Sequence, residues 1–199
     1  MITMSAAAPR TLLETAWPQD TAARRVGMVV AALFGVCLLT LSAKVQVPFW
    51  PVPMTMQTLV VLMLGMAYGS RLAAGTVLAY LLAGAAGLPV FAGTPERGIG
   101  LAYMMGPTAG FLVGFVLAAW LVGVLAERGW DRSFLRCAAA MVLGHAVITL
   151  SGLAWLAVLF GTPKAIEVGL MPFLASSALK TALGAVSMPM LWRLLAAER

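Results

Sequence analysis

Six apolar stretches, separated by short polar or proline-rich segments, follow one another along the chain after residue 25. A membrane about 30 Å thick is crossed by a helix of roughly 20 apolar residues, and the second and third stretches fall short of that length. Because lipid leaves no water to satisfy an open backbone, each span is predicted to be an α-helix. The sequence therefore predicts an all-α integral membrane bundle of six transmembrane helices, at residues 25–43, 56–69, 71–86, 106–125, 137–160 and 170–196.

The segments around the spans define the domain organisation. Residues 1–24 are predicted to be a cytoplasmic N-terminal tail, and residues 25–196 a single six-helix membrane domain. Three prolines make residues 44–54 a stiff extended strap, since proline fixes φ and restricts the residue before it. Residues 87–105 form a long, largely apolar connection, which argues against disorder. This segment is predicted to be an external lid, with a hydrophobic plug at the bundle mouth as the alternative.

Composition and charge agree with a membrane location and set an orientation. Apolar residues make up 62% of the chain and charged residues only 10%, well below the charged share of soluble domains. Arginines gather on the side of the two termini, whereas the other side has only Lys44, Arg97 and Lys164, so the positive-inside rule places both termini in the cytoplasm. The net charge of +6 is spread over separate loops, and no nucleic-acid partner is expected. Two isolated cysteines, Cys37 and Cys137, indicate neither a disulfide framework nor a metal site.

Lys180 is conspicuous because it lies near the middle of the last predicted span. A helix that enters the membrane at Met171 carries position 180 roughly 13 Å deep, close to the midplane. A lysine at that depth costs about 2.5–3.5 kcal/mol, so it is expected to face a cavity or a polar partner. The alternatives are a structural hydrogen bond to carbonyl groups, or a side chain that snorkels towards a helix end.

Other polar side chains are predicted to form a pocket with Lys180 near the external face. Ser177 shares its helical face, and Arg97 in the lid offers a second cation. Thr55 is a natural N-cap for the second span, while Gln57 is expensive to bury unpaired, or else faces water at the interface. Two cations, amide groups and aromatic walls suit a small carboxylate with an apolar body.

A stripe of small residues on the first span has two interpretations. Gly27, Ala31 and Gly35 recur at four-residue intervals, which permits close approach of another helix. The stripe either packs against another span of this chain or forms an interface with a partner membrane protein. A non-transporting assembly subunit is the function that the second interpretation favours.

An enzymatic function is poorly supported. His145 and Ser151 lie in one predicted span, but six residues of helix separate them by about 9 Å and turn them apart. His145 is therefore expected to be packed or pore-facing. The sequence has no phosphate-cradling lysine motif, so any ATP hydrolysis must occur on a partner. We predict that the chain is not an enzyme and carries no cofactor or metal.

Four motifs follow one another across nearly the whole chain after residue 25. They are VPMTMQTL at 52–59, GLPVFAG at 87–93, GPTAGFLVGF at 106–115, and Pro172-Phe173 followed by Lys180. Together they resemble the BioY family of biotin transporters. The resemblance implies a bacterial cytoplasmic-membrane protein that binds biotin at the external side and delivers it inward. It also implies the substrate-capture (S) component of an energy-coupling factor transporter, with a transmembrane coupling subunit and two cytoplasmic ATPase subunits as partners.

Carried over residue by residue, the resemblance gives Lys180 and Arg97 as partners of the biotin carboxylate or of its ring polar groups. It makes Thr55 and Gln57 candidate pocket contacts. One departure concerns Ser177, which occupies the position where the family's Pro-Phe-x-x-Gly-Asp-x-x-Lys pattern has aspartate. Serine accepts a hydrogen bond but does not neutralise the lysine, so either another group does this or the lysine charge is directed at the ligand. An S component for another small carboxylate vitamin is the alternative within this class.

Overall fold

The computed structural model describes residues 11–16, 20–47, 52–96 and 98–197. Eight α-helices make up most of this part of the chain: α1 (Thr21–Lys44), α2 (Gln57–Tyr68), α3 (Ser70–Ala85), α4 (Gly100–Met104), α5 (Ala109–Glu127), α6 (Phe134–Phe160), α7 (Thr162–Gly169) and α8 (Met171–Ala197). Short elements complete it: 3-10 turns η1 (Leu13–Ala16) and η2 (Trp130–Arg132), and strands β1 (Gln46–Val47) and β2 (Met54–Thr55).

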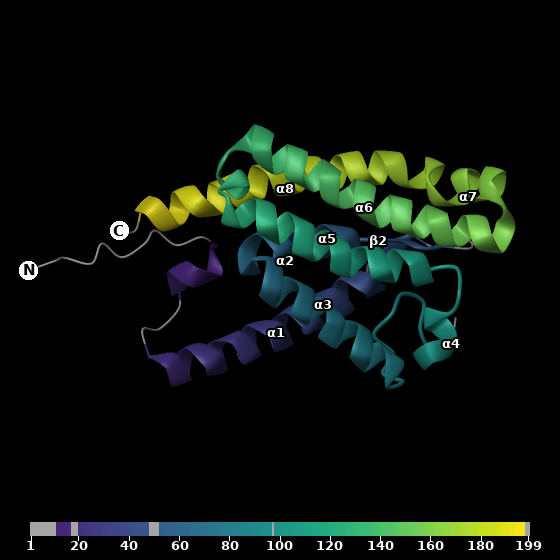
Figure 1. Cartoon of the computed structure of the whole chain (residues 1–199), viewed down its shortest axis with the longest axis horizontal. Coiled ribbons are helices and arrows are strands. Elements are labelled where there is room, and N and C mark those ends of the chain that lie inside the picture. Colours follow the sequence, from purple (N-terminus) through teal and green to yellow (C-terminus); the bar gives the residue numbers. More distant parts are fainter. Residues whose placement is uncertain (1–10, 17–19, 48–51, 97, 198–199) are drawn as a thin grey trace, which may run out of the picture.

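Helix α5 lies at the centre of the bundle and packs against α2, α3 and α6 (Figure 1). Gly110 and Gly114, four residues apart, both face α6. A Cβ added at Gly114 would lie 2.8 Å from the Cα of Ile148, so only glycine allows this approach. Because no side chain separates the two backbones, α5 and α6 cross closely, as small residues allow in membrane bundles.

The helices have the length and exterior of a membrane protein. Among the described helices, α1, α5 and α6 are long and apolar enough to span a membrane, and the bent pair α7–α8 provides a fourth candidate. Helices α2 and α3 are apolar but shorter. Side chains such as Val30, Leu33 and Phe34 on α1 remain about 60% exposed, as expected where lipid covers them. The all-α membrane prediction is confirmed, while the count of six spanning helices stays a prediction.

Several predicted boundaries need correction. Helix α1 begins at Thr21, four residues before the predicted start of the first span, and the side chain of Asp20 accepts a hydrogen bond from Ala23 N at 2.7 Å. The division into a cytoplasmic tail and a membrane domain stays a prediction. The prediction that Thr55 caps the second span is wrong, since it lies on β2 and α2 begins at Gln57 with Met56 at the cap. The last span is preceded by a separate helix, α7, which the apolar pattern does not predict.

The predicted strap, residues 44–54, is a two-stranded ribbon at its described ends. Strands β1 and β2 pair antiparallel, with Gln46 opposite Thr55 and Val47 opposite Met54. The prolines at 48 and 51 lie outside the described residues. The ribbon brings the Thr55 backbone to the start of α2, where the pocket described below begins.

The small-residue stripe of α1 packs within the chain at two of its three positions. A Cβ at Gly35 would lie 2.6 Å from Cγ2 of Thr76 on α3. The carbonyl of Ala31 accepts a hydrogen bond from the Tyr68 hydroxyl at 2.9 Å. These contacts match the intrachain interpretation, and a partner interface involving Gly27 stays a prediction.

Candidate functional site

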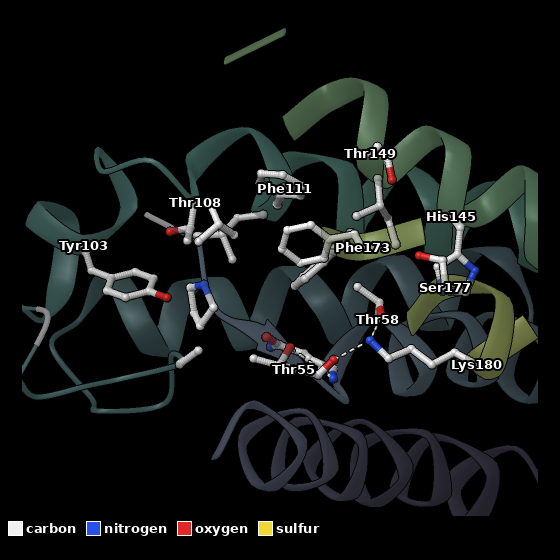
Figure 2. Close-up of a pocket in the computed structure, with 17 residues that line it drawn as sticks. Thr55, Thr58, Tyr103, Thr108, Phe111, His145, Thr149, Phe173, Ser177 and Lys180 are labelled. Atoms are coloured by element: carbon white, nitrogen blue, oxygen red, sulfur yellow. Dashed lines mark hydrogen bonds between the residues drawn. The ribbon is translucent and has the colours of Figure 1, made fainter. Parts of the chain in front are cut away.

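A pocket lies between α2, α5, α6 and α8, next to the segment 87–105. It contains about 600 Å³ of atom-free space, a figure that includes its open mouth. Figure 2 shows Tyr103 and Thr108 at one end, and Lys180 and His145 at the other. Two aromatic rings, Phe111 and Phe173, line the middle, with their centroids 5.9 Å apart. The pocket thus has an apolar centre between two polar ends.

Lys180 points from α8 towards α2 and the ribbon. Its side chain is 4% exposed, and the ammonium donates to the Thr55 carbonyl at 2.6 Å and to the Thr58 hydroxyl at 3.0 Å (Figure 2). The snorkelling interpretation is therefore wrong, whereas a structural hydrogen bond to a carbonyl is present. An ammonium has three N–H donors, so one is unused by the described residues. No carboxylate occurs among the described pocket-lining residues, and the charge is not neutralised there.

Three further predicted residues line the same pocket: Thr55, Gln57 and Ser177. Thr55 accepts a hydrogen bond from the Gln57 backbone N–H at 3.3 Å, in addition to the lysine contact through its carbonyl. Gln57 is 4% exposed, so the interpretation that it faces water is wrong. Its Nε2 has no partner among the described residues. Ser177 is half-buried on α8, one turn before the lysine, and Arg97 lies outside the described residues.

Several residues that line the pocket are not among the predicted site residues. Thr58 holds the lysine, and Thr149 lies one turn beyond His145 on α6. His145 and Thr149 are four positions apart in an otherwise apolar span. Residues at this spacing share a helix face, so the pattern indicates a polar face on this helix. His145 was predicted to be packed or pore-facing, and it lines the pocket with only 6% of its surface exposed. Ser151 instead packs against Gly114 on α5 and is not among the lining residues.

The segment 87–105 closes over the pocket and also plugs the bundle. The Phe91 ring is 1% exposed, stacks on Tyr103 at 4.8 Å and meets Tyr80 edge-on at 5.5 Å. Ala92 and Tyr103 belong to the pocket wall. Lys44, at the end of α1, donates to the carbonyls of Phe91 and Thr94 at 3.0 Å and to the Thr94 hydroxyl at 2.9 Å. The segment therefore combines features of the two interpretations that the sequence left open.

The chemistry of the pocket is that of noncovalent recognition. It offers a buried ammonium, the amide nitrogen of Gln57 and an imidazole around apolar walls. Within the described ranges, no group of three or more His, Cys, Asp or Glu side chains is placed to hold a metal ion. A ligand with hydrogen-bond acceptors and an apolar body matches this arrangement.

Comparisons with known proteins agree with the motifs. The model of the BioY family matches residues 14–197. The "Biotin transporter BioY" of Rhizobium etli is 38% identical over 170 residues, covering 80% of this chain and 89% of the relative. The protein of the same name from Thermotoga maritima is 34% identical over 160 residues, and the "Probable biotin transporter BioY" of Pyrococcus horikoshii 36% over 160; each match covers 80% of this chain and 91% of the relative.

A solved structure has the same fold. The crystal structure of the S-component for biotin from an ECF-type ABC transporter matches with a TM-score of 0.73, covering 87% of this chain and 95% of that one. At 21% sequence identity this likeness establishes the fold alone. The resemblance inferred from the four motifs is confirmed by the family match and by the relatives. The chain belongs to the BioY family.

Proposed function

We propose that this protein is a biotin uptake transporter that binds biotin in the pocket beneath the segment 87–105 and delivers it to the cytoplasm. One observation carries the proposal: the Lys180 ammonium is buried beside an open pocket whose described lining contains no carboxylate. A buried charge is tolerated when a partner satisfies it, and biotin offers acceptors both in its carboxylate and in its ureido ring. The names of the relatives support biotin as the ligand.

The apolar middle of the pocket supports the same ligand. Biotin has a fused ring system and an aliphatic tail between its two polar ends. Phe111 and Phe173 offer aromatic surface to such a body, and burial of apolar area supplies most of the affinity of small-molecule sites. Gln57, Thr55 and Ser177 are the proposed additional contacts, and Arg97 is a proposed contact from the segment 87–105.

Equilibrium binding of radiolabelled biotin to the purified protein tests this proposal. We expect Lys180→Met to weaken binding by about 10- to 100-fold, because hydrogen bonds to a charged group contribute about 1.5–3 kcal/mol. Lys164→Met is the matched control, since Lys164 forms an exposed pair with Glu167 at 2.9 Å and does not line the pocket. Arg97→Ala tests the contact carried over from the resemblance.

Three results would contradict parts of the proposal. Failure of the unaltered protein to bind biotin would exclude the function. Equal binding by the Lys180 and Lys164 variants would exclude the site but not the function. Displacement of labelled biotin by another carboxylate vitamin at a lower concentration than unlabelled biotin requires would favour the alternative, an S component for that vitamin.

We further propose that six elements cross the bacterial cytoplasmic membrane, with α2 and α3 as short spans and both termini in the cytoplasm. The start of α1 and the end of α8 lie at one end of the molecule, and α4 and α7 at the opposite end (Figure 1). The arginine-rich loops belong to the former end, as the positive-inside rule requires. A reporter fused after residue 199 is expected to report the cytoplasmic side, and reporters inserted in the segments 87–105 and 161–170 the external side. Activity on the same side would exclude this topology.

Coupling to partners is the remaining part of the proposal. The likeness to the S-component for biotin of an ECF-type ABC transporter supports a substrate-capture role. The transmembrane coupling subunit and the two ATPase subunits are carried over from the family resemblance. We expect biotin uptake by cells that express the complete set, and reduced uptake when the ATPase subunits are deleted. Undiminished uptake in the deletion strain would show that this chain transports biotin without them.

A further inference from the structure

His145 presents a buried hydrogen-bond acceptor to the pocket. Its Nδ1 lies 3.0 Å from the Met141 carbonyl oxygen, one turn earlier on α6, and 3.3 Å from the Thr181 hydroxyl. Since a carbonyl only accepts, Nδ1 carries the proton, and the neutral ring leaves a lone pair on Nε2. Nε2 is buried and has no partner among the described residues. A buried acceptor without a partner is costly, so a ligand donor is expected to satisfy it.

The groups near this nitrogen are of the opposite kind. Lys180, at the same end of the pocket (Figure 2), has an N–H that no described residue uses. Gln57, which lines the same pocket, has an Nε2 without a hydrogen-bond partner among the described residues. On the far side of the imidazole, the groove between α6 and α8 is lined mainly by apolar residues. This end of the pocket therefore offers donors on one side and an acceptor on the other.

A carboxylate does not match that combination. Its two oxygens only accept, so it satisfies Lys180 but sets lone pairs against the His145 Nε2. A cyclic urea has a carbonyl oxygen flanked by two N–H groups. It accepts from Lys180 and donates to the imidazole at the same time.

We propose that His145 Nε2 accepts a hydrogen bond from a ureido N–H of biotin, with the ureido oxygen turned to Lys180 and the carboxylate tail directed to the Tyr103 end of the pocket. The inference rests on the proposed function and adds its orientation and a specificity-determining residue. Ser177 lines the same pocket from α8 but brings no negative charge, and His145 supplies an acceptor from the facing helix.

Binding measurements with two His145 variants test the hydrogen bond. His145→Leu removes the acceptor, and His145→Gln keeps an acceptor oxygen near the Nε2 position. We expect the leucine variant to bind biotin about 5- to 100-fold more weakly, the effect of leaving one buried donor unpaired, and the glutamine variant to recover most of the loss. Ser151→Ala, on the same helix but outside the pocket lining, is the control and is expected to bind normally.

Ligand analogues distinguish a contact from a structural effect. Biotin methylated on one ureido nitrogen lacks the N–H of that nitrogen. For the isomer that lacks the N–H proposed to bind His145, we expect His145→Leu and the unaltered protein to bind with equal affinity. Biotin methyl ester keeps both N–H groups, so the leucine substitution should weaken its binding by the same factor as for biotin. If the substitution weakens biotin but not the ester, the imidazole lies beside the carboxylate and the proposed orientation is wrong. If biotin binds the unaltered and leucine proteins equally, the contact is wrong while the function stands.

A spectroscopic measurement needs no substitution. The chain contains one histidine, so ¹⁵N-labelled histidine with an affinity tag free of histidine gives a single imidazole to observe. We expect a protonated Nδ1 and an unprotonated Nε2 without ligand, and an upfield shift of the Nε2 signal when biotin is added. An Nε2 signal that does not move on saturation with biotin would overturn the proposal. Absence of any binding by the same sample would instead overturn the proposed function.

Discussion

At the scale of single residues, Gly84 determines how the segment 87–105 packs on the bundle. A Cβ at this position of α3 would overlap the ring of Phe91. The ring is held between Tyr80 and Tyr103, and Tyr103 is itself part of the pocket wall. Since cores are packed at crystal-like density, a displaced Phe91 would carry the wall with it.

We therefore expect Gly84→Ala to lower both stability and biotin affinity. Overpacking of a full core costs about 1–3 kcal/mol. Gly75→Ala is the matched control on the same helix, because a Cβ there meets nothing within 4 Å and alanine favours the helix by about 0.5–1 kcal/mol. Thermal unfolding in detergent and biotin binding measure the two effects. Equal unfolding temperatures and affinities for the two variants would show that the Phe91 packing does not support the pocket.

The residues of the candidate site were only partly predictable from sequence. Lys180 was identifiable because charges are rare inside spans, and Gln57 because a buried amide needs partners. The contact between Lys180 and Thr58 was not, since the two residues are 122 positions apart and meet only after α8 has packed on α2. The unpaired state of His145 Nε2 likewise depends on which side chains surround it, which no local pattern contains.

At the scale of elements, Lys44 ties α1 to the segment 87–105. Its ammonium donates to three oxygens, two of them backbone carbonyls, so all of its donors are used. Helix α1 thus holds the covering segment at Phe91 and Thr94, which precede α4 along the chain. A clamp of this kind acts on ligand release, because release requires the covering segment to move.

We expect Lys44→Met to increase the rate of biotin dissociation by about 3- to 10-fold, with a smaller effect on association, as is typical of changes in one contact region. The expected increase in the dissociation rate is small because Lys44 is exposed and water partly replaces its hydrogen bonds. Displacement of bound labelled biotin by excess unlabelled biotin measures the rate. A dissociation rate equal to that of the unaltered protein would mean that opening does not break this contact.

The long helices were predictable and the short elements were not. Runs of apolar residues specify α1, α5 and α6 within a few residues at each end. The separation of α7 from α6 follows from Gly161, whose φ of +81° ends the helix, and from Pro163 in the first turn of α7. Gly161 and Pro163 are both visible in the sequence, but hydropathy alone predicts only the two apolar spans on either side of them. The pairing of β1 with β2 depends on a contact across the proline-rich segment, which hydropathy does not encode.

At the scale of the whole molecule, contacts of a buried carboxylate join the turn between α5 and α6 to α8 at the end opposite the pocket. Asp131, in the turn between α5 and α6, is completely buried and accepts a hydrogen bond from Trp192 Nε1 on α8 at 2.5 Å. The guanidinium of Arg132 lies 4.5 Å from the centre of the Trp192 ring, within cation–π distance. The turn and α8 are thereby joined at this end, while the contacts of Lys180 join α8 to α2 and the ribbon at the pocket.

This junction makes a pH-dependent contribution to stability whose sign follows from burial. Burial raises the pKa of Asp131, and the hydrogen bond from Trp192 and the charge of Arg132 offset this only in part. The folded state therefore binds the proton at a higher pH than the unfolded state, and the contribution of this group to stability falls as pH rises from its ordinary pKa through its raised one. Asp131→Asn removes the titration, so the unaltered protein should lose apparent stability relative to the variant as pH rises above the ordinary pKa of aspartate.

Thermal unfolding in detergent as a function of pH measures the difference in stability between the unaltered protein and Asp131→Asn. Trp192→Phe provides a second test. Loss of the indole N–H removes a group that lowers the pKa of folded Asp131. The decline in stability should start at the ordinary pKa in both proteins but end at a lower pH for the unaltered protein than for the phenylalanine variant. Parallel pH profiles of the unaltered protein and Asp131→Asn would mean that the carboxyl does not change protonation on unfolding. Because the pocket lies at the other end of α8, biotin affinity at neutral pH should be the same for Asp131→Asn and the unaltered protein, which separates the stability of the bundle from recognition of the ligand.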